Sequence, residues 1–221
     1  MFHWLEKNPF FFAVGVFLVI AYAGIITILP DFMNSARPVV GTKPYTVLQL
    51  AGRHVYIKDS CNACHSQLIR PFKSETDRYG KYSLSGEYAY DRPFLWGSKR
   101  TGPDLHRIGN YRTTDWHENH MLNPEEIVPG SIMPAYKHQF TNLADIETAY
   151  AEAVVVKNVF NTPYGDEFVG TKEAWKAYKP TVLAEAKAIA DNMKNKDVKE
   201  AVAKGEVPEI VALIAYLNSL K

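Results

Sequence analysis

The stretch Cys61-Asn62-Ala63-Cys64-His65 decides how this chain folds. Its two cysteines are the only ones among 221 residues. A disulfide normally joins distant parts of a chain, which this pair cannot do, so the cysteines indicate chemistry rather than a crosslink. Two thiols at this spacing can reach the two vinyl groups of one haem, and the next residue, His65, is then held beneath the iron. The motif therefore predicts one covalently attached haem c.

Two other uses of the motif are open. A thioredoxin-like redox pair would follow a strand in a βαβ context, whereas helical patterning precedes Cys61. A zinc site would need two further ligands, which His117 and His120 could supply. Haem attachment is the favoured interpretation.

Helical patterning occurs both directly before the motif and at the end of the chain. Before it, one apolar stripe begins near Thr46 and runs directly into Cys61. The last helix is expected to begin at Pro208 and carries a second stripe. The two stripes consist of Val47, Leu50, Ala51 and Val55, and of Ile210, Leu213, Ile214, Leu217 and Leu220.

The N-terminus carries a run without charge, Phe10 to Leu29, which would span roughly 30 Å as a helix. Trp4 and Lys7 precede it, as interfacial anchors would. Its length favours a retained membrane anchor over a cleaved signal peptide or a buried helix. We expect an anchor over residues 1–30 and a linker over residues 31–43.

The middle of the chain has less regular patterning. Residues 66–100 hold seven aromatic side chains and no helical period, so we expect a long ordered loop with a short hairpin near Ser85-Gly86. Residues 101–140 are expected to be rich in loops. Helices are expected from an Asn142 cap to about Lys157 and from Pro180 to about Lys194.

The sixth ligand of the iron must come from elsewhere in the chain. Met133 is the best candidate, because Pro134 stiffens its loop downstream of the haem motif, and Met121, in a polar segment near two histidines, is the rival methionine. A thioether ligand raises the reduction potential of the haem and fills the sixth position of the iron, which favours electron exchange over oxygen binding. Histidine ligation is the alternative, with these candidates: His106, His117, His120 and His138.

Several of these features together resemble the class I cytochromes c. The matching segments are Gly52 and Tyr56 before the motif, the motif itself, Thr101-Gly102-Pro103-Asp104-Leu105, Met133-Pro134, and a last helix bearing Tyr216. The resemblance implies that Gly52 and Tyr216 meet where the first and last helices cross. It also implies that the Pro103 carbonyl orients His65, and that Arg112 is a partner for a haem propionate.

The resemblance narrows when the anchor and three longer segments are added. The segments are Ile69-Arg70-Pro71-Phe72, residues 85–105 and Pro129-Gly130-Ser131-Ile132-Met133-Pro134. Together they resemble the mono-haem subunit of the cbb-type cytochrome c oxidases, in the C family of haem–copper oxidases. The fold implied is mainly α: a transmembrane helix, then a class I cytochrome c-like haem domain over residues 44–221 with long loops and insertions at 66–100 and 141–206.

The resemblance implies an electron-transfer subunit that is not itself catalytic. Electrons would arrive from another cytochrome c, subunit or soluble, and pass to a large haem–copper subunit that reduces oxygen. Because haem is attached to such motifs outside the cytoplasmic membrane, the haem domain would lie in the periplasm of a bacterium, on a single-pass anchor. The alternatives are the small subunit of nitric oxide reductase, and a haem enzyme or gas sensor with an open sixth position.

Charge and aromatic content suggest where partners dock. The net charge of +1 points to no nucleic acid. Residues 66–112 carry net +4 and residues 113–140 net −3, which predicts either two docking faces or solvated loops with propionate-pairing arginines. The aromatic side chains of residues 66–100 fit a buried interface, so we expect this insertion to pack on the large membrane subunit.

Overall fold

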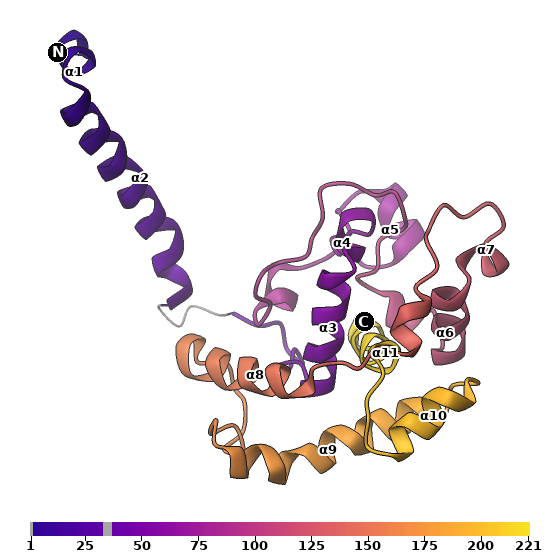
Figure 1. Ribbon diagram of the computed structural model, residues 1–221. Helices are drawn as coiled ribbons and strands as arrows, with labels where there is room; N and C mark the ends of the chain where they lie inside the picture. Colours follow the sequence, from indigo (N-terminus) through magenta and orange to yellow (C-terminus); the bar gives the residue numbers. More distant parts are fainter. Residues whose placement is uncertain (1, 33–36) are drawn as a thin grey trace.

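The computed structural model describes residues 2–32 and 37–221, and the regular structure of these residues is helical, as the sequence predicts. The one β-type pairing within them is an isolated bridge between Leu143 and Pro208. A long N-terminal helix stands apart from a helical domain (Figure 1). The helices are α1 (Phe2–Lys7), α2 (Pro9–Phe32), α3 (Val47–Lys58), α4 (Cys61–Cys64), α5 (Lys73–Tyr79), η1 (Ser85–Tyr88), η2 (Ile108–Asn110), α6 (Thr114–Leu122), α7 (Pro124–Ile127), η3 (Lys137–Phe140), α8 (Ile146–Phe160), α9 (Lys172–Ala190), α10 (Lys196–Ala203) and α11 (Glu209–Ser219).

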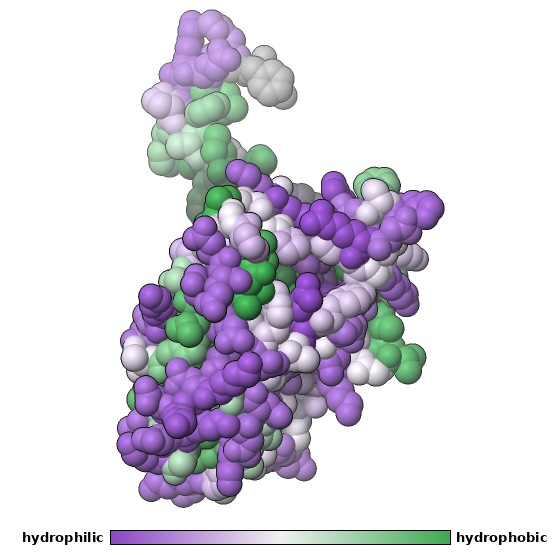
Figure 2. Space-filling model, turned by 90° about the vertical axis from the view of Figure 1, so that its right-hand side faces the viewer, coloured by the Kyte–Doolittle hydropathy of each residue, from purple (hydrophilic) through white to green (hydrophobic). Residues whose placement is uncertain are grey.

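Helix α2 has the length and composition of a membrane span. Its apolar part runs over Pro9–Pro30, with none of the tested window buried against the rest of the protein. Apolar side chains follow one another along it, whereas the face of the domain seen in the same view is mostly hydrophilic (Figure 2). Exposed Phe and Ile side chains at this density suit lipid rather than water. Residues 33–36 of the expected linker lie outside the described residues.

Helices α3 and α11 cross at the centre of the domain. Helix α3 begins at Thr46, whose hydroxyl accepts from the Gln49 N–H at 3.2 Å, while the Gln49 side chain accepts from the Thr46 N–H at 3.0 Å. This reciprocal capping box satisfies two backbone donors that a helix start leaves open. At the crossing a Cβ on Gly52 would lie 1.9 Å from the carbonyl oxygen of Ala212 and 2.9 Å from the Cβ of Tyr216. Only glycine permits this approach, so the crossing inferred from the resemblance is present.

The C-terminal half of the domain encloses this crossing. Helix α8 lies against α3, and α9 lies against α11, α10 and α3. Tyr150 of α8 is buried among three aromatic rings, Phe168, Trp175 and Tyr178, at 5.2–5.7 Å between centroids. The segment 141–206 is therefore part of the core and not an appendage to a smaller domain.

The structure corrects four sequence-based expectations. No hairpin forms near Ser85-Gly86, where the chain instead makes the 3₁₀ helix η1, and the preceding stretch contains α5. Helix α8 is capped by Asp145, which accepts from the Thr148 N–H at 2.9 Å, and not by Asn142.

Proline 180 does not begin a helix. It lies inside α9, which starts at the Thr171 cap; Pro180 and Lys176 are both exposed, so water can reach the carbonyl that lacks its helical donor. Residues 101–140 are also less irregular than expected, since they include α6 and α7.

Candidate functional site: a haem-attachment motif and its surroundings

The motif is placed by a sharp break after α3. Ser60 adopts a left-handed conformation with φ of 58°, which ends α3 and starts the single turn α4 that holds both cysteines. Their thiols are unbonded to each other, Cys61 buried and Cys64 exposed. Burial raises the pKa of the Cys61 thiol to about 12. Two free thiols on one turn are the arrangement that attachment to a single cofactor requires.

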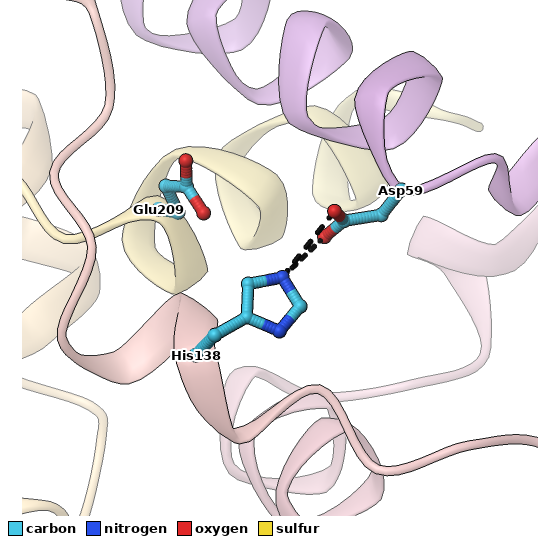
Figure 3. Close-up of side chains that lie close together, drawn as sticks. All are labelled: Asp59, His138 and Glu209. Carbon is cyan, nitrogen blue, oxygen red and sulfur yellow. Dashed lines mark hydrogen bonds and ion pairs between the residues drawn. The ribbon is translucent and has the colours of Figure 1, made fainter.

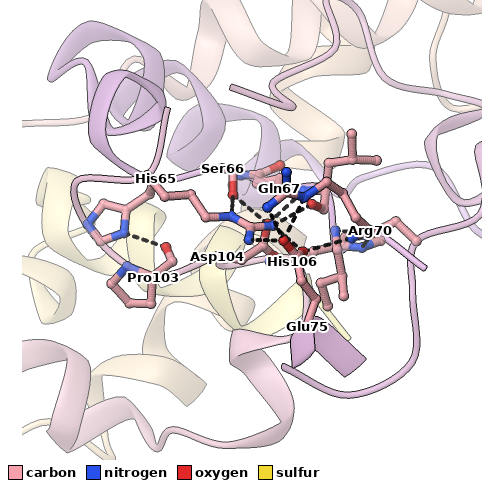
Figure 4. A network of polar contacts seen from close by, with 12 residues as sticks. His65, Ser66, Gln67, Arg70, Glu75, Pro103, Asp104 and His106 are labelled. Atoms are coloured by element: carbon pink, nitrogen blue, oxygen red, sulfur yellow. Dashed lines mark hydrogen bonds and ion pairs between the residues drawn. The ribbon is translucent and has the colours of Figure 1, made fainter. Parts of the chain in front are cut away.

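His65 is fixed by the loop opposite. Its Nδ1–H donates to the Pro103 carbonyl oxygen at 2.9 Å (Figure 4), which leaves Nε2 with a free lone pair. The neighbouring Gly102 lies against the ring, because a Cβ there would be 2.2 Å from His65 Cε1. Burial lowers the pKa of His65, which favours the neutral ring that a metal ligand needs.

A buried polar network holds that loop in place (Figure 4). Asp104 accepts from the Ser66 hydroxyl at 2.6 Å and from the Leu68 N–H at 2.8 Å. Arg100 donates to both oxygens of Glu75, at 2.7 and 2.8 Å. These hydrogen bonds from Arg100 hold the pKa of Glu75 down at about 2. The network ties the chain just after His65 to the loop that carries Pro103.

The same network accounts for part of the positive charge of residues 66–112. Arg70 and Arg100 pair with Glu75, and Arg107 pairs with Glu87. These arginines stabilise the loops internally. The charge imbalance alone is therefore weak support for a docking face.

A second group of side chains, not predicted from the sequence as a cluster, lies on α6 and just before it. The Arg112 guanidinium lies over the Trp116 ring at 4.6 Å, and Trp116 stacks on His120 at 4.5 Å. His117 Nε2 and His120 Nδ1 are buried and have no hydrogen-bond partner. Burial lowers the pKa of His117 to about 4. Burial also lowers the pKa of His120, and the nearby Arg112 guanidinium acts in the same direction. The i, i+3 spacing of the histidines was the only signal in the sequence.

Met133 lies in the loop after α7. It is partly buried and packs against the apolar core, whereas its neighbour Ile132 is 82% exposed. The Tyr136 N–H donates to the Met121 carbonyl at 2.8 Å and anchors this loop on α6. The other histidines considered as iron ligands have different surroundings: His106 contacts Ser83 and Tyr88, and His138 contacts Asp59.

These residues fit a haem. A bound haem would engage the two free thiols and the available Nε2 of His65. Its propionates would engage the unpartnered buried ring nitrogens beside Arg112. A zinc site of Cys61, Cys64, His117 and His120 does not form, since the one three-ligand group among the described residues is a different one. The fold and motif thus define a helical cytochrome c domain that follows a helix with the length and composition of a membrane span.

The chain belongs to the FixO family of cytochrome c oxidase mono-haem subunits, whose family model matches residues 2–221. A comparison with curated proteins gives no match. The family match confirms the resemblance drawn from residues 1–140 and extends it through residues 141–206. It also decides between the two respiratory complexes considered, in favour of the oxidase over nitric oxide reductase.

Proposed function

We propose that this subunit relays electrons through one covalently bound, His/Met-ligated haem c to the catalytic subunit of its oxidase. The observation that carries the proposal is the His65–Pro103 hydrogen bond directly after two free cysteines. Cys61 and Cys64 would form the thioether bonds, and His65 Nε2 would bind the iron. When bound, the haem supplies a one-electron iron couple.

The chain's own residues would then set how that couple behaves. The Pro103 carbonyl orients His65 and increases its basicity as a ligand. Met133 would occupy the sixth position and raise the potential. Arg112, His117 and His120 would offer donors to the propionates. The chain needs no proton-transfer or nucleophilic group for this task, so its role is transfer and not catalysis.

The position of the domain follows from where such haems are attached. With α2 crossing the cytoplasmic membrane once and the N-terminus inside, residues 37–221 would lie in the periplasm. There the haem could accept electrons from another cytochrome c and deliver them to the membrane-embedded partner.

The insertion 66–100 is the proposed docking surface for that partner. Phe94 and Trp96 stack at 4.5 Å, and their side chains are 45% and 37% exposed, with Phe72 and Tyr82 also exposed. Exposed aromatic pairs of this kind are enriched in the centres of interfaces. Paired Phe94→Ser and Trp96→Ser substitutions are expected to reduce co-purification of the catalytic subunit without loss of haem. Val169→Ser, at a residue 61% exposed outside the insertion, is the matched control. Undiminished co-purification would remove the insertion from the interface.

The ligation test uses the oxidised full-length protein. Met133→Leu is expected to abolish the far-red absorption band of a Met–iron(III) bond and to permit rapid carbon monoxide binding after reduction. Met193→Leu, at a methionine buried after α9, should leave both properties unchanged. If the unaltered protein lacks the band and binds carbon monoxide quickly, the electron-transfer proposal fails and an open sixth position is correct.

A further inference from the structure

Three side chains from separate parts of the domain meet beside the α3–α11 crossing (Figure 3). Asp59 ends α3, His138 belongs to η3, and Glu209 begins α11. One nitrogen or oxygen atom of each lies within 4.8 Å of the others. His138 Nε2 is 3.1 Å from the nearer oxygen of Asp59.

The group is not satisfied by its own hydrogen bonds. Glu209 is only 6% exposed, and its Oε2 is buried with no partner. Its other oxygen pairs with Lys58, whose own side chain is half exposed. The fully buried Gln139 donates to Asp59 at 2.6 Å, yet its carbonyl oxygen Oε1 also lacks a partner. A buried carboxylate with an unsatisfied oxygen is costly unless a cation compensates it.

The net charge of these side chains also favours a bound cation. Two carboxylates and one ammonium leave this group with net −1 when His138 is neutral, and the ammonium reaches only one of the carboxylates. A dication placed between the three side chains would neutralise Asp59 and Glu209 together and accept the lone pair of His138. Lys58 would then be released to solvent.

We propose that Asp59, His138 and Glu209 form a binding site for a divalent transition metal of the zinc type. One imidazole with two carboxylates is a donor set that zinc accepts, whereas calcium prefers oxygen ligands alone. Donor atoms on a zinc ion with bonds of about 2.1 Å lie about 3.4 Å apart, so the donor atoms, which lie up to 4.8 Å apart, need to close by up to about 1.4 Å. Water or the Gln139 carbonyl would complete a fourth position.

The site would join three parts of the domain. Asp59 is two residues before Cys61, Glu209 begins the helix that crosses α3, and His138 follows the Met133 loop. A metal here would hold that loop against the two central helices. Because it would bind the folded chain alone, zinc is expected to raise the unfolding temperature.

The test is calorimetric titration of ZnCl₂ into the untagged, haem-loaded, full-length protein in detergent, with CaCl₂ in parallel. We expect one zinc per chain, no comparable calcium binding, and an increase in Tm. His138→Ala and Glu209→Gln should each weaken zinc binding at least about tenfold. His54→Ala is the matched control, since His54 pairs with a single carboxylate, Glu152, and should bind zinc as the unaltered protein does.

The Lys58→Met variant tests the sign of the effect. Lys58 competes with the metal for Glu209, so removing it should tighten zinc binding. The proposal is overturned if the protein binds no zinc at millimolar concentration, if His138→Ala binds as tightly as the unaltered chain, or if Lys58→Met binds more weakly.

Discussion

Replacing Gly52 by alanine tests the central helix crossing most directly. In an open helix interior this change would stabilise the protein by about 1 kcal/mol. Here the new Cβ would lie 1.9 Å from the Ala212 carbonyl oxygen and 2.5 Å from its carbon. Both are backbone atoms, so no side-chain rotation relieves the overlap, and α3 and α11 must separate by roughly 1 Å or more to reach an ordinary carbon–oxygen contact.

Overpacking of a core typically costs about 1–3 kcal/mol and sometimes more. Because the overlap is with backbone atoms, the cost lies near the upper end of this range, about 3 kcal/mol. After the helix-propensity gain of about 1 kcal/mol, we expect Gly52→Ala to lose about 2 kcal/mol of unfolding free energy. At about 2–4 °C per kcal/mol for a domain of this size, the unfolding temperature should fall by roughly 4–8 °C. The assay is thermal unfolding of the haem-loaded protein, followed by circular dichroism at 222 nm.

The matched control is Gly24→Ala in α2, where a Cβ would meet nothing within 4 Å. It should leave the unfolding temperature of the domain unchanged. If Gly52→Ala unfolds at the same temperature as the unaltered protein, or higher, the two helices do not make the close crossing described here.

Three further outcomes are expected. Gly102→Ala would place a Cβ 2.6 Å from His65 Nδ1, so we expect the His65–Pro103 hydrogen bond to break. The midpoint potential of the haem should then shift, and an unchanged midpoint potential in a redox titration would contradict this. Glu75→Gln leaves Arg100 in the buried network without its main partner, so the free energy of unfolding in urea at pH 7 should fall by about 3–5 kcal/mol. This difference between the variant and the unaltered protein should shrink as pH falls from about 4.5 to 2, because Glu75 itself becomes protonated there. Burial lowers the pKa of His106 to about 4, so the unfolded chain takes up a proton below pH 6.5 that the folded chain refuses until about pH 4. Stability should therefore fall as pH drops through this window, and His106→Gln should reduce the slope by up to about 1.4 kcal/mol per pH unit; an unaltered slope would show that His106 is already protonated in the folded protein.

Local sequence signals were sufficient to predict the two central helices, α3 and α11, and the haem-attachment motif. Thr46 and Gln49 form their capping box within four residues, and the apolar stripe of α11 fits a single helical face. The apolar composition of α2 likewise predicted a helix that could span a membrane. In each case the sequence carries the information within one or two helical turns.

The segment 66–100 could not be predicted in this way, because its structure depends on distant partners. Glu75 on α5 is fixed by Arg100, and Tyr88 on η1 stacks on His106 at 4.8 Å. No periodicity marks such contacts. The cluster of Arg112, Trp116 and His120 was missed for the same reason, since its members are recognisable only when α6 is folded.

The burial of Cys61 has a consequence for how the protein is made. In the folded domain this thiol belongs to the same apolar cluster as α11, and its pKa of about 12 keeps it protonated and unreactive. The proposed thioether bond at Cys61 would therefore be expected to form before the C-terminal helix α11 packs over this thiol. Under the proposed covalent attachment, haem attachment would compete with folding of the domain, and substitutions that accelerate folding would be expected to lower the yield of haem-loaded protein.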